Sequence, residues 1–430
     1  MLKRIYTLYM IFPKSLLSSL YGSDVNVGNF TKRVEKLRSI INGICPNDSP
    51  IHVFSVPGRA DLVGSHTDHQ KGRAIAAALS LDTLALVKKR DDLWLNVYSD
   101  GFTPVHVNLS SLEKEELEIG SAPSLARGVA AALDMSGRKI GGADIVSNSI
   151  IPRARGLSSS AAFEVLIGSV LSFLYNDECL SASDIAKAGW WAENNYYEKP
   201  CGILDQSASA TGGIIEFDGG YGANGKSTKL PSSFIGKDYS LIITNTGPEH
   251  SDLTEPYSAI INDMKKVASF FSKKHLSEVK EDEFFSSLLD VRASLKDDRA
   301  VLRAIHYFDE SKRVSEMRCA LSKNNIKEFL RIINASGDSS EELLQNTFVS
   351  STPNEQSIPL ALGLTKRFIR EHGGATRMQG GGFAGCIQTF VLKKYKKDYI
   401  ALMESYFGKN ASREVFIREE KAGYIGTLKA

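Results

Sequence analysis

Seven polar side chains that could act as acids, bases or hydrogen-bonding groups lie within residues 56–69. This stretch follows the segment IHVFS, whose apolar positions alternate as in a half-buried strand, and precedes the apolar run AIAAALSLDTLALVKK. A polar group buried near a core costs roughly 1–3 kcal/mol when it is left unpaired, so these side chains must satisfy one another or bind a polar ligand. They are Arg59, Asp61, Ser65, His66, Thr67, Asp68 and His69.

A short run of small and hydroxyl residues, 156–159, leads into a segment that predicts a helix. From Ser160 onward the residues are good helix formers with apolar positions at helical spacing. The first turn of a helix leaves backbone N–H groups unpaired at the positive end of its dipole, where phosphate binds, whereas an ordinary N-cap would need only one serine. The predicted phosphate loop consists of Gly156, Leu157, Ser158, Ser159, Ser160 and Ala161.

Two further stretches carry candidate functional residues. Asp205 stands among small and apolar residues in GILDQSA, where an ionised carboxylate needs a cationic or hydrogen-bonding partner. It is either a functional group or a structural N-cap or buried hydrogen-bonding residue. The run GGGFAGC begins with Gly380, Gly381 and Gly382, which either let the backbone approach a ligand closely or form a tight turn without one.

A literal match to the phosphate-loop pattern GxxxxGK[ST] occurs in GYGANGKS, residues 220–227. That pattern binds phosphate only when a helix follows it. Here the next residues are TKLPSSFIG, which contain Pro231 and show no helical period. The sequence therefore predicts a hairpin turn between two strands at this point.

Taken in order, the four landmarks resemble the GHMP small-molecule kinases, and most closely the galactokinases. The first signature of that family resembles residues 57–59 and 64–68, and its phosphate loop resembles residues 156–162. Its Gly-x-x-Asp-Gln site resembles residues 202–206, and its late glycine motif resembles residues 380–386. The resemblance covers nearly the whole chain.

This resemblance implies a two-lobed α/β (α+β) protein of the GHMP kinase fold, with mixed sheets, helices and an active site in the cleft between the lobes. It implies ATP and magnesium as cofactors and phosphoryl transfer to the anomeric hydroxyl of galactose, giving galactose 1-phosphate. Asp205 matches the catalytic aspartate and Arg59 its partner arginine, while Ser160 and Glu193 match the magnesium ligands. The positions that line the sugar match Ser65, His66, Asp68, Gly202 and Tyr257.

The sequence departs from the galactokinase pattern on the sugar side. Galactokinases commonly carry glutamate where this chain has Ser65, and that glutamate reaches the 6-hydroxyl of the sugar. Serine can still bind a hydroxyl and no longer repels a carboxylate at C6, so galacturonate remains an alternative substrate. His69-Gln70 also resembles the DHQ run of galacturonate kinases and of some bacterial galactokinase-like proteins.

Other departures lie on the nucleotide side. Ala154 and Ala384 stand where the family usually has glycine, and Gln379 stands where it usually has a hydroxyl residue, so ATP binding could be weakened. A second alternative is a non-catalytic regulator that binds galactose and ATP, since some galactokinase relatives act in this way. The uninterrupted loop at residues 158–162 favours the enzyme. A mevalonate or homoserine kinase is disfavoured because the run His66-Thr67-Asp68 is specific to the sugar branch.

The elements that position these motifs follow from periodicity and turn signals. Helices are predicted at about residues 15–45, at 121–137 and in several charged amphipathic segments between about 256 and 335. Strands are predicted in GGADIVSNS, in the end of the segment 199–220 and in YSLIITNT, while residues 373–394 predict a turn, a glycine loop and a strand. We expect an N-terminal lobe at residues 1–218 and a C-terminal lobe at residues 219–430.

Composition limits the class of protein. With 430 residues, 42% of them hydrophobic and 24% charged, the chain predicts an ordinary globular protein of two domains. Its net charge of +2 recruits neither nucleic acid nor membrane. Five scattered cysteines without a CxxC pair predict a cytoplasmic protein, and we expect a monomer or weak oligomer. The apolar segment at residues 5–12 predicts an extra N-terminal turn, or a true start at Met10, rather than a signal peptide.

Overall fold

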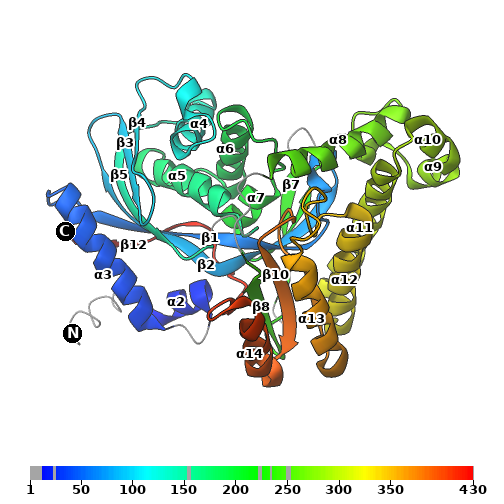
Figure 1. Ribbon diagram of the computed structural model, residues 1–430. Helices are drawn as coiled ribbons and strands as arrows, with labels where there is room; N and C mark the ends of the chain where they lie inside the picture. The colour runs from blue at the N-terminus through cyan, green and yellow to red at the C-terminus, as the bar shows by residue number, and fades with distance from the viewer. Residues whose placement is uncertain are drawn as a thin grey trace.

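Two β-sheets with helices on both faces of each organise the protein (Figure 1). The computed structural model describes residues 12–22, 26–152, 156–220, 225–232, 235–247 and 253–429. The predicted mixed α/β class is confirmed. The question of the start codon and the position of Ala154 lie outside the described residues.

The larger sheet has eight strands, and β1 and β2 form its centre as a long antiparallel pair. The strand order is β12-β1-β2-β5-β3-β4, with β6 paired to β2 and β7 paired to β6. Nearly every residue of β1 and β2 is buried, as expected for a strand covered on both faces. The strands are β1 (Ile51–Val63), β2 (Arg73–Lys89), β3 (Trp94–Ser99), β4 (Val105–Asn108), β5 (Ala143–Ser149), β6 (Ile214–Asp218), β7 (Lys226–Leu230) and β12 (Gly423–Leu428).

Helices cover both faces of this sheet because successive strand residues point to opposite sides. On β1, Val53 belongs to the core under α2 and α3, whereas its neighbour Phe54 belongs to the core under α5. Figure 1 shows α4 to α7 above the sheet and α2 and α3 below it. These helices are α2 (Lys14–Tyr21), α3 (Val27–Ile44), α4 (Ala122–Met135), α5 (Ser159–Tyr175), α6 (Ala182–Asn195) and α7 (Leu204–Thr211).

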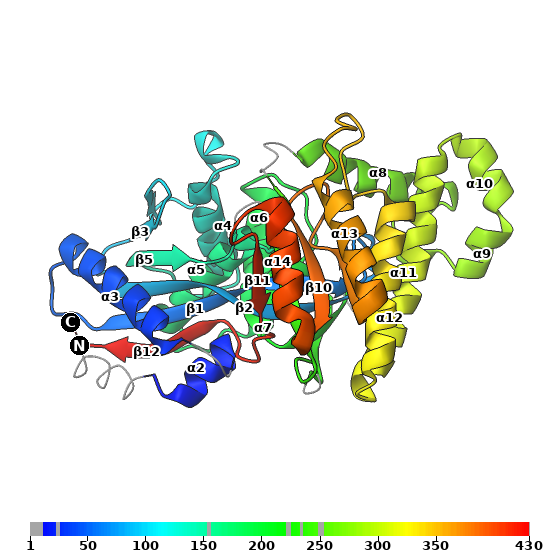
Figure 2. The ribbon, with the colours of Figure 1, turned by 60° about the horizontal axis from the view of Figure 1, so that its bottom comes forward.

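The smaller sheet has the order β11-β8-β10-β9. Helices α13 and α14 lie side by side on one face and contact Ile242, while α12 packs on the other face with the core that contains Leu241 (Figure 2). The elements are β8 (Tyr239–Asn245), β9 (Gly374–Met378), β10 (Cys386–Leu392), β11 (Ser412–Val415), α12 (Ile326–Ser339), α13 (Ser357–His372) and α14 (Lys396–Phe407).

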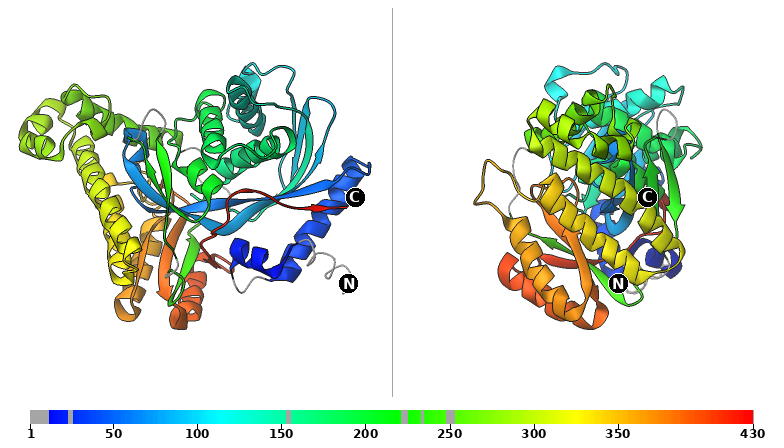
Figure 3. Two further views of the ribbon diagram at one scale, coloured as in Figure 1. Left: turned by 180° about the vertical axis from the view of Figure 1, so that it is seen from behind. Right: turned by 90° about the vertical axis from the view of Figure 1, so that its right-hand side faces the viewer.

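A helical extension with its own core lies between β8 and α12 in the chain. Seen from behind in Figure 3, it lies at the end of the molecule opposite α3 and β12. The charged amphipathic helices predicted between residues 256 and 335 are confirmed here. The elements of the extension are α8 (Thr254–Phe270), α9 (Glu281–Ser286), α10 (Leu288–Leu295) and α11 (Asp298–Ser322).

Most local predictions are confirmed, and two are corrected. Strands β6 and β7 pair antiparallel on either side of residues 219–225, as predicted for the match to the phosphate-loop pattern. Strand β1 continues beyond the predicted segment IHVFS to Val63, so Arg59 and Asp61 belong to this strand. The segment GATRM, predicted as part of a turn, is strand β9, which pairs with β10.

The predicted boundary between residues 218 and 219 falls within the larger sheet. Strand β7 pairs with β6, and β12 pairs with β1, so two strands from beyond residue 218 complete that sheet. A boundary at this point in the chain stays a proposal.

Candidate active site

Arg59 and Asp205 form an ion pair where β1 meets the first turn of α7. Arg59 Nε lies 2.8 Å from Asp205 Oδ1, and Nη2 lies 2.7 Å from the same oxygen. Ser158 donates its hydroxyl to Asp205 Oδ2 at 2.5 Å. The structure thus brings the two residues predicted to be catalytic into contact with each other and with the predicted phosphate loop.

The surroundings of Asp205 keep its carboxylate ionised. Burial raises its pKa, but the guanidinium of Arg59 and the hydroxyl of Ser158 outweigh burial, so the pKa of Asp205 lies below its ordinary value. The side chain of Asp205 is 36% exposed, whereas that of Arg59 is only 5% exposed. An ionised carboxylate that a ligand can reach is suited to accept a proton from a hydroxyl.

The predicted phosphate loop leads directly into α5. Ser158 has a left-handed backbone with φ of 58°, and no side chain caps the helix that starts at Ser159. The first N–H groups of α5, including that of Ser160, have no partner within the helix. Leu157 and Ala161 are both buried and fix the loop and the helix in the core. The start of α5 can therefore bind an anion.

The late glycine motif packs against this loop. A Cβ atom at Gly380 would lie 2.5 Å from Gly156 Cα, and both glycines have positive φ, 72° and 70°. The Gln379 amide donates to the Gly156 carbonyl at 2.9 Å, although the two residues are 223 positions apart in the chain. Arg59 also donates to that carbonyl. Two predicted nucleotide motifs therefore form one backbone surface beside Arg59.

Asp68 lies beside Gly202, at the start of the 3₁₀ helix η1 (Asp68–Gln70). A Cβ atom at residue 202 would overlap the Asp68 carboxylate, so glycine there leaves room for it. Burial and the charges of Asp205 and Asp61 raise the pKa of Asp68 to about 6. The Asp68 carboxylate thus belongs to the same charged group as the Arg59–Asp205 pair.

His66 and Tyr257 line the site from the turn before η1 and from α8. The two rings stack with their centroids 6.3 Å apart and their planes at 26°. The His66 Nε2 atom lies 3.0 Å from the Gly381 carbonyl, and Tyr257 donates its hydroxyl to the Gly382 carbonyl at 3.2 Å. Burial lowers the pKa of His66 to about 4, so its imidazole is neutral near pH 7. Both residues are thereby tied to the glycine motif.

Ser65 is held through its backbone by residues that sequence reasoning missed. Its N–H and that of Gly64 donate to Glu310 Oε2 at 3.2 and 2.6 Å, and its carbonyl lies 3.0 Å from His306 Nε2. Ser336 also donates to this carboxylate, at 2.8 Å. Glu310 and His306 lie on α11, more than 240 residues along the chain, and no local pattern distinguishes them from other helix residues.

Glu193 on α6 belongs to a buried group of polar side chains. Its Oε1 lies 3.0 Å from Lys199 Nζ, and its Oε2 accepts from Gln206 Nε2 at 2.8 Å. Gln206 also donates to Glu164 Oε2 at 2.9 Å. Burial and the charge of Glu193 raise the pKa of Glu164 well above its ordinary value.

Ser160 and Glu193 offer a hydroxyl and a carboxylate from two helices that pack together. Hard Mg²⁺ prefers oxygen ligands and takes few of them from protein. Among the described residues, no three His, Cys, Asp or Glu side chains form a metal-binding group. A magnesium ion held by these two residues, water and phosphate fits this donor set.

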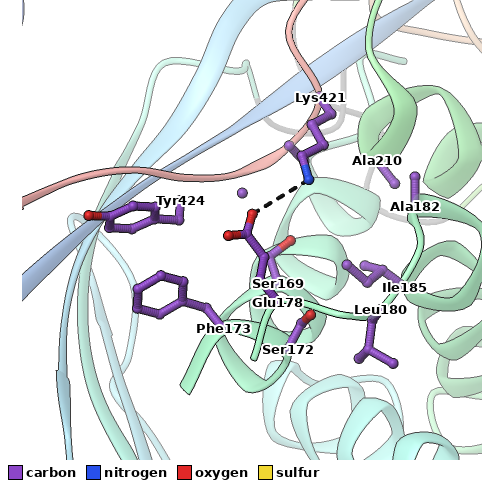
Figure 4. Close-up of a pocket in the computed structure, with 12 residues that line it drawn as sticks. Ser169, Ser172, Phe173, Glu178, Leu180, Ala182, Ile185, Ala210, Lys421 and Tyr424 are labelled. Atoms are coloured by element: carbon purple, nitrogen blue, oxygen red, sulfur yellow. Dashed lines mark hydrogen bonds and ion pairs between the residues drawn. The ribbon is translucent and has the colours of Figure 1, made fainter. Parts of the chain in front are cut away.

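The recess in Figure 4 lies elsewhere, at the C-terminal ends of α5 and α7. It is lined by Phe173, Ala210 and Tyr424 among others, and the Glu178–Lys421 ion pair forms part of its wall. Its volume of about 20 Å³ is room for about one water molecule. This recess is therefore too small for a sugar and is separate from the Arg59–Asp205 site.

Known proteins resemble this chain over most of its length. Residues 46–89 match the galactokinase galactose-binding signature, and residues 124–213 match the GHMP kinases N-terminal domain. A galactokinase of Clostridium tetani (strain Massachusetts / E88) is 31% identical over 349 residues, which cover 79% of this chain and 84% of that relative. The chain belongs to the galactokinase family of GHMP kinases. A galactokinase of Actinobacillus pleuropneumoniae serotype 5b (strain L20) is 30% identical over 345 residues, covering 78% of this chain and 84% of the relative.

Solved structures share the galactokinase fold. The crystal structure of Lactococcus lactis galactokinase complexed with galactose matches with a TM-score of 0.76 and 22% identity, covering 92% of this chain and 100% of that one. Methanococcus jannaschii mevalonate kinase matches with a TM-score of 0.60 and 19% identity, covering 85% of this chain and 98% of that one. The predicted GHMP kinase fold is thereby confirmed.

Proposed function

We propose that this galactokinase family member is an ATP-dependent kinase that phosphorylates the anomeric hydroxyl of galactose, giving galactose 1-phosphate and ADP. The observation that carries the proposal is the set of contacts made by Asp205. Its carboxylate touches Arg59 from the strand of the galactose-binding signature and Ser158 from the phosphate loop. One accessible carboxylate thus borders both the sugar motif and the nucleotide motif.

The proposed chemistry uses Asp205 as the base. Phosphoryl transfer requires the protein mainly to position two reactants and to neutralise charge. The C1 oxygen attacks the γ-phosphorus as its proton passes to the Asp205 carboxylate, and the bond from the γ-phosphorus to the bridging oxygen of ADP breaks. Arg59 keeps Asp205 ionised before transfer, and the N–H groups at the start of α5 bind phosphate oxygens. Ser160 and Glu193 would hold magnesium, which neutralises phosphate charge when it is bound.

On the sugar side, Asp68 offers a carboxylate that can accept two neighbouring hydroxyls at once. The stacked rings of His66 and Tyr257 border it, and the glycine motif holds both rings. A sugar presents hydroxyls at its edge and apolar C–H groups on its face, so a carboxylate beside aromatic rings suits it. Gly202 leaves the space that the Asp68 carboxylate occupies.

Galacturonate is the second candidate substrate, because Ser65 carries no charge that would repel a carboxylate at C6. The surroundings of Ser65 favour galactose. Glu310 lies under the Ser65 backbone, and although burial opposes ionisation, His306 and the neighbouring arginines Arg377 and Arg313 lower the pKa of Glu310 below its ordinary value. The C6 carboxylate of galacturonate would be a second buried carboxylate close to Glu310, and the two negative charges would repel each other. A regulator without catalysis is disfavoured by the intact contacts of Asp205.

The proposed partners are galactose and MgATP, and we propose a monomer or weak oligomer. We propose a cytoplasmic location because the five cysteines are scattered along the chain without a CxxC pair, which fits a reducing compartment. Within the described residues, no helix has the length and apolar character to cross a membrane.

The experiment that tests this function is product analysis. Purified protein is incubated with MgATP and galactose, and the product is examined by ¹H and ³¹P NMR. We expect a phosphate coupled to the anomeric proton and an equal amount of ADP. A phosphate at any other position, or sugar and ATP binding without a product, would refute the proposal and favour another phosphotransferase or the regulator.

A further inference from the structure

A second carboxylate lies against the arginine of the proposed catalytic pair. Asp61 stands two residues after Arg59 on β1, so the two side chains lie on the same face of the strand. Asp61 Oδ1 lies 2.9 Å from Arg59 Nε, the nitrogen that also donates to Asp205 Oδ1 at 2.8 Å. Arg59 is therefore shared by two carboxylates, of which only Asp205 receives a hydrogen bond from it.

The Asp61 carboxylate is buried and pairs with Arg59. It is 9% exposed, and its Oδ1 receives no hydrogen bond from any described residue. A buried carboxylate without hydrogen bonds destabilises a fold. The strand is held at this point by the Asp61 carbonyl, which accepts from Gln388 and, at 3.4 Å, from Arg377.

We propose that Asp61 is a positioning residue of the kinase reaction, which shares the charge of Arg59 and so prevents Arg59 from fully neutralising Asp205. This inference rests on the proposed function. Burial raises the pKa of Asp61, and the charge of Arg59 opposes that rise. With all three groups ionised, Arg59, Asp205 and Asp61 carry one net negative charge, and without Asp61 they would carry none. Two consequences follow from that charge: Asp205 stays a stronger base, and the site attracts the anionic ATP less strongly.

The charged groups that face this triad come from four places in the chain. Asp68 belongs to η1, Lys199 precedes α7, Arg377 lies on β9 and Glu310 lies on α11. Arg377 and Glu310 interact with each other, so their opposite charges balance. The Arg377 guanidinium donates to the Asp61 carbonyl, and its charge, like that of Arg59, lowers the pKa of the Asp61 carboxyl.

The test is Asp61→Asn, compared with the wild type and with Asp144→Asn. Asp144 is also a buried strand carboxylate paired with an arginine, Arg90, but it lies outside the site. For Asp61→Asn we expect kcat to fall about fivefold and the KM for ATP to fall about threefold. The loss of one negative charge makes Asp205 a weaker base and strengthens the binding of anionic ATP. Asp144→Asn should leave both constants unchanged.

A merely structural role would raise the KM for ATP or leave it unchanged, so a fall in both constants supports the proposal and any other pattern overturns it. Calorimetric binding of a non-hydrolysable ATP analogue is a readout independent of turnover. Tighter binding by Asp61→Asn supports the inference even if galactose proves not to be the substrate, whereas unchanged or weaker binding contradicts it. If Asp61→Asn does not fold, Asp61→Ser takes its place, and the same changes in kcat, in the KM for ATP and in binding of the ATP analogue decide the outcome.

Discussion

At the scale of single residues, the site depends on how three carboxylates are arranged around one arginine. Asp205 is held ionised by Arg59 and Ser158, while burial raises the pKa values of Asp61 and Asp68. Carboxylates with such different surroundings can take different roles at one pH. Asp205 is the one that is both ionised and accessible, so the proposed base assignment belongs to it.

The first residue prediction concerns Asp205→Asn. The amide keeps the shape of the side chain but cannot accept the proton, so kcat should fall about a thousandfold. The Kd for galactose should change by less than about threefold, because Asp68 and His66 remain to bind the hydroxyls. ADP release and titration calorimetry measure the two quantities. Turnover close to that of the wild type would exclude Asp205 as the base.

The second residue prediction concerns the pH dependence of galactose binding. The pKa of Asp68 is about 6, and we expect only its ionised form to bind the sugar hydroxyls. One pH unit below that pKa about a tenth of the carboxylate is ionised, so the Kd for galactose should rise about tenfold from about pH 7.5 to about pH 5. His66, with its pKa near 4, stays neutral over this range. Asp68→Asn should bind more weakly and lose the pH dependence, and a flat profile in the wild type would contradict this role.

At the scale of elements, the proposed nucleotide site consists of two loops that touch through glycines. Gly380, between β9 and β10, leaves no room for a Cβ atom against Gly156, before α5. The phosphate loop is therefore positioned by a loop from the smaller sheet as well as by its own helix. A shift in either loop would displace the ATP phosphates relative to Arg59.

Gly380→Ala tests this contact. The added methyl must push residue 156 away, and we expect kcat/KM for ATP to fall about tenfold or more, as for other small displacements of a reacting group. Gly120→Ala is the matched control, because its φ is 73° against 72° at Gly380, but nothing lies within 4 Å of the new Cβ. Equal kinetic effects of the two substitutions, measured by ADP release, would mean that backbone strain alone explains the loss.

Local sequence patterns predicted the elements that carry strong signals. Residues 159–175 form a helix and residues 214–218 and 226–230 form a hairpin, as the helical period and the turn chemistry required. Strand β9 was missed because GATRM has a glycine and no apolar alternation. Its strand conformation comes from pairing with β10, a contact that no local window contains.

At the scale of the whole molecule, the larger sheet is assembled from distant parts of the chain. Strand β12 pairs with β1, and the fully buried Arg418, just before it, donates to the Ser55 hydroxyl at 2.6 Å and to its carbonyl at 3.0 Å. Distant parts of the chain also meet in the site, where Glu310 and His306 hold the backbone of Ser65. The sequence motifs were enough to predict that Arg59 and Asp205 belong to one site. They could not predict that Glu310 and His306 hold Ser65, because these two helix residues reach Ser65 only through the fold.

This assembly predicts the behaviour of a truncated chain. A protein of residues 12–218 lacks β7 and β12, and so exposes the edge of β1 and the cavity left by Arg418. We expect it to aggregate or to unfold without a cooperative transition in circular dichroism. Cooperative unfolding with a Tm within about 5 °C of the full chain would instead support an independent lobe at residues 1–218.

The most direct test of the central claim is ADP release by the purified full chain with MgATP and, in parallel, galactose, galacturonate, N-acetylgalactosamine, glucose or no sugar, with Asp205→Asn as the background. The proposed function predicts fast release with galactose, slow release with the other sugars and none above background in the variant. Release that no sugar stimulates, or that galacturonate stimulates more than galactose, would contradict it.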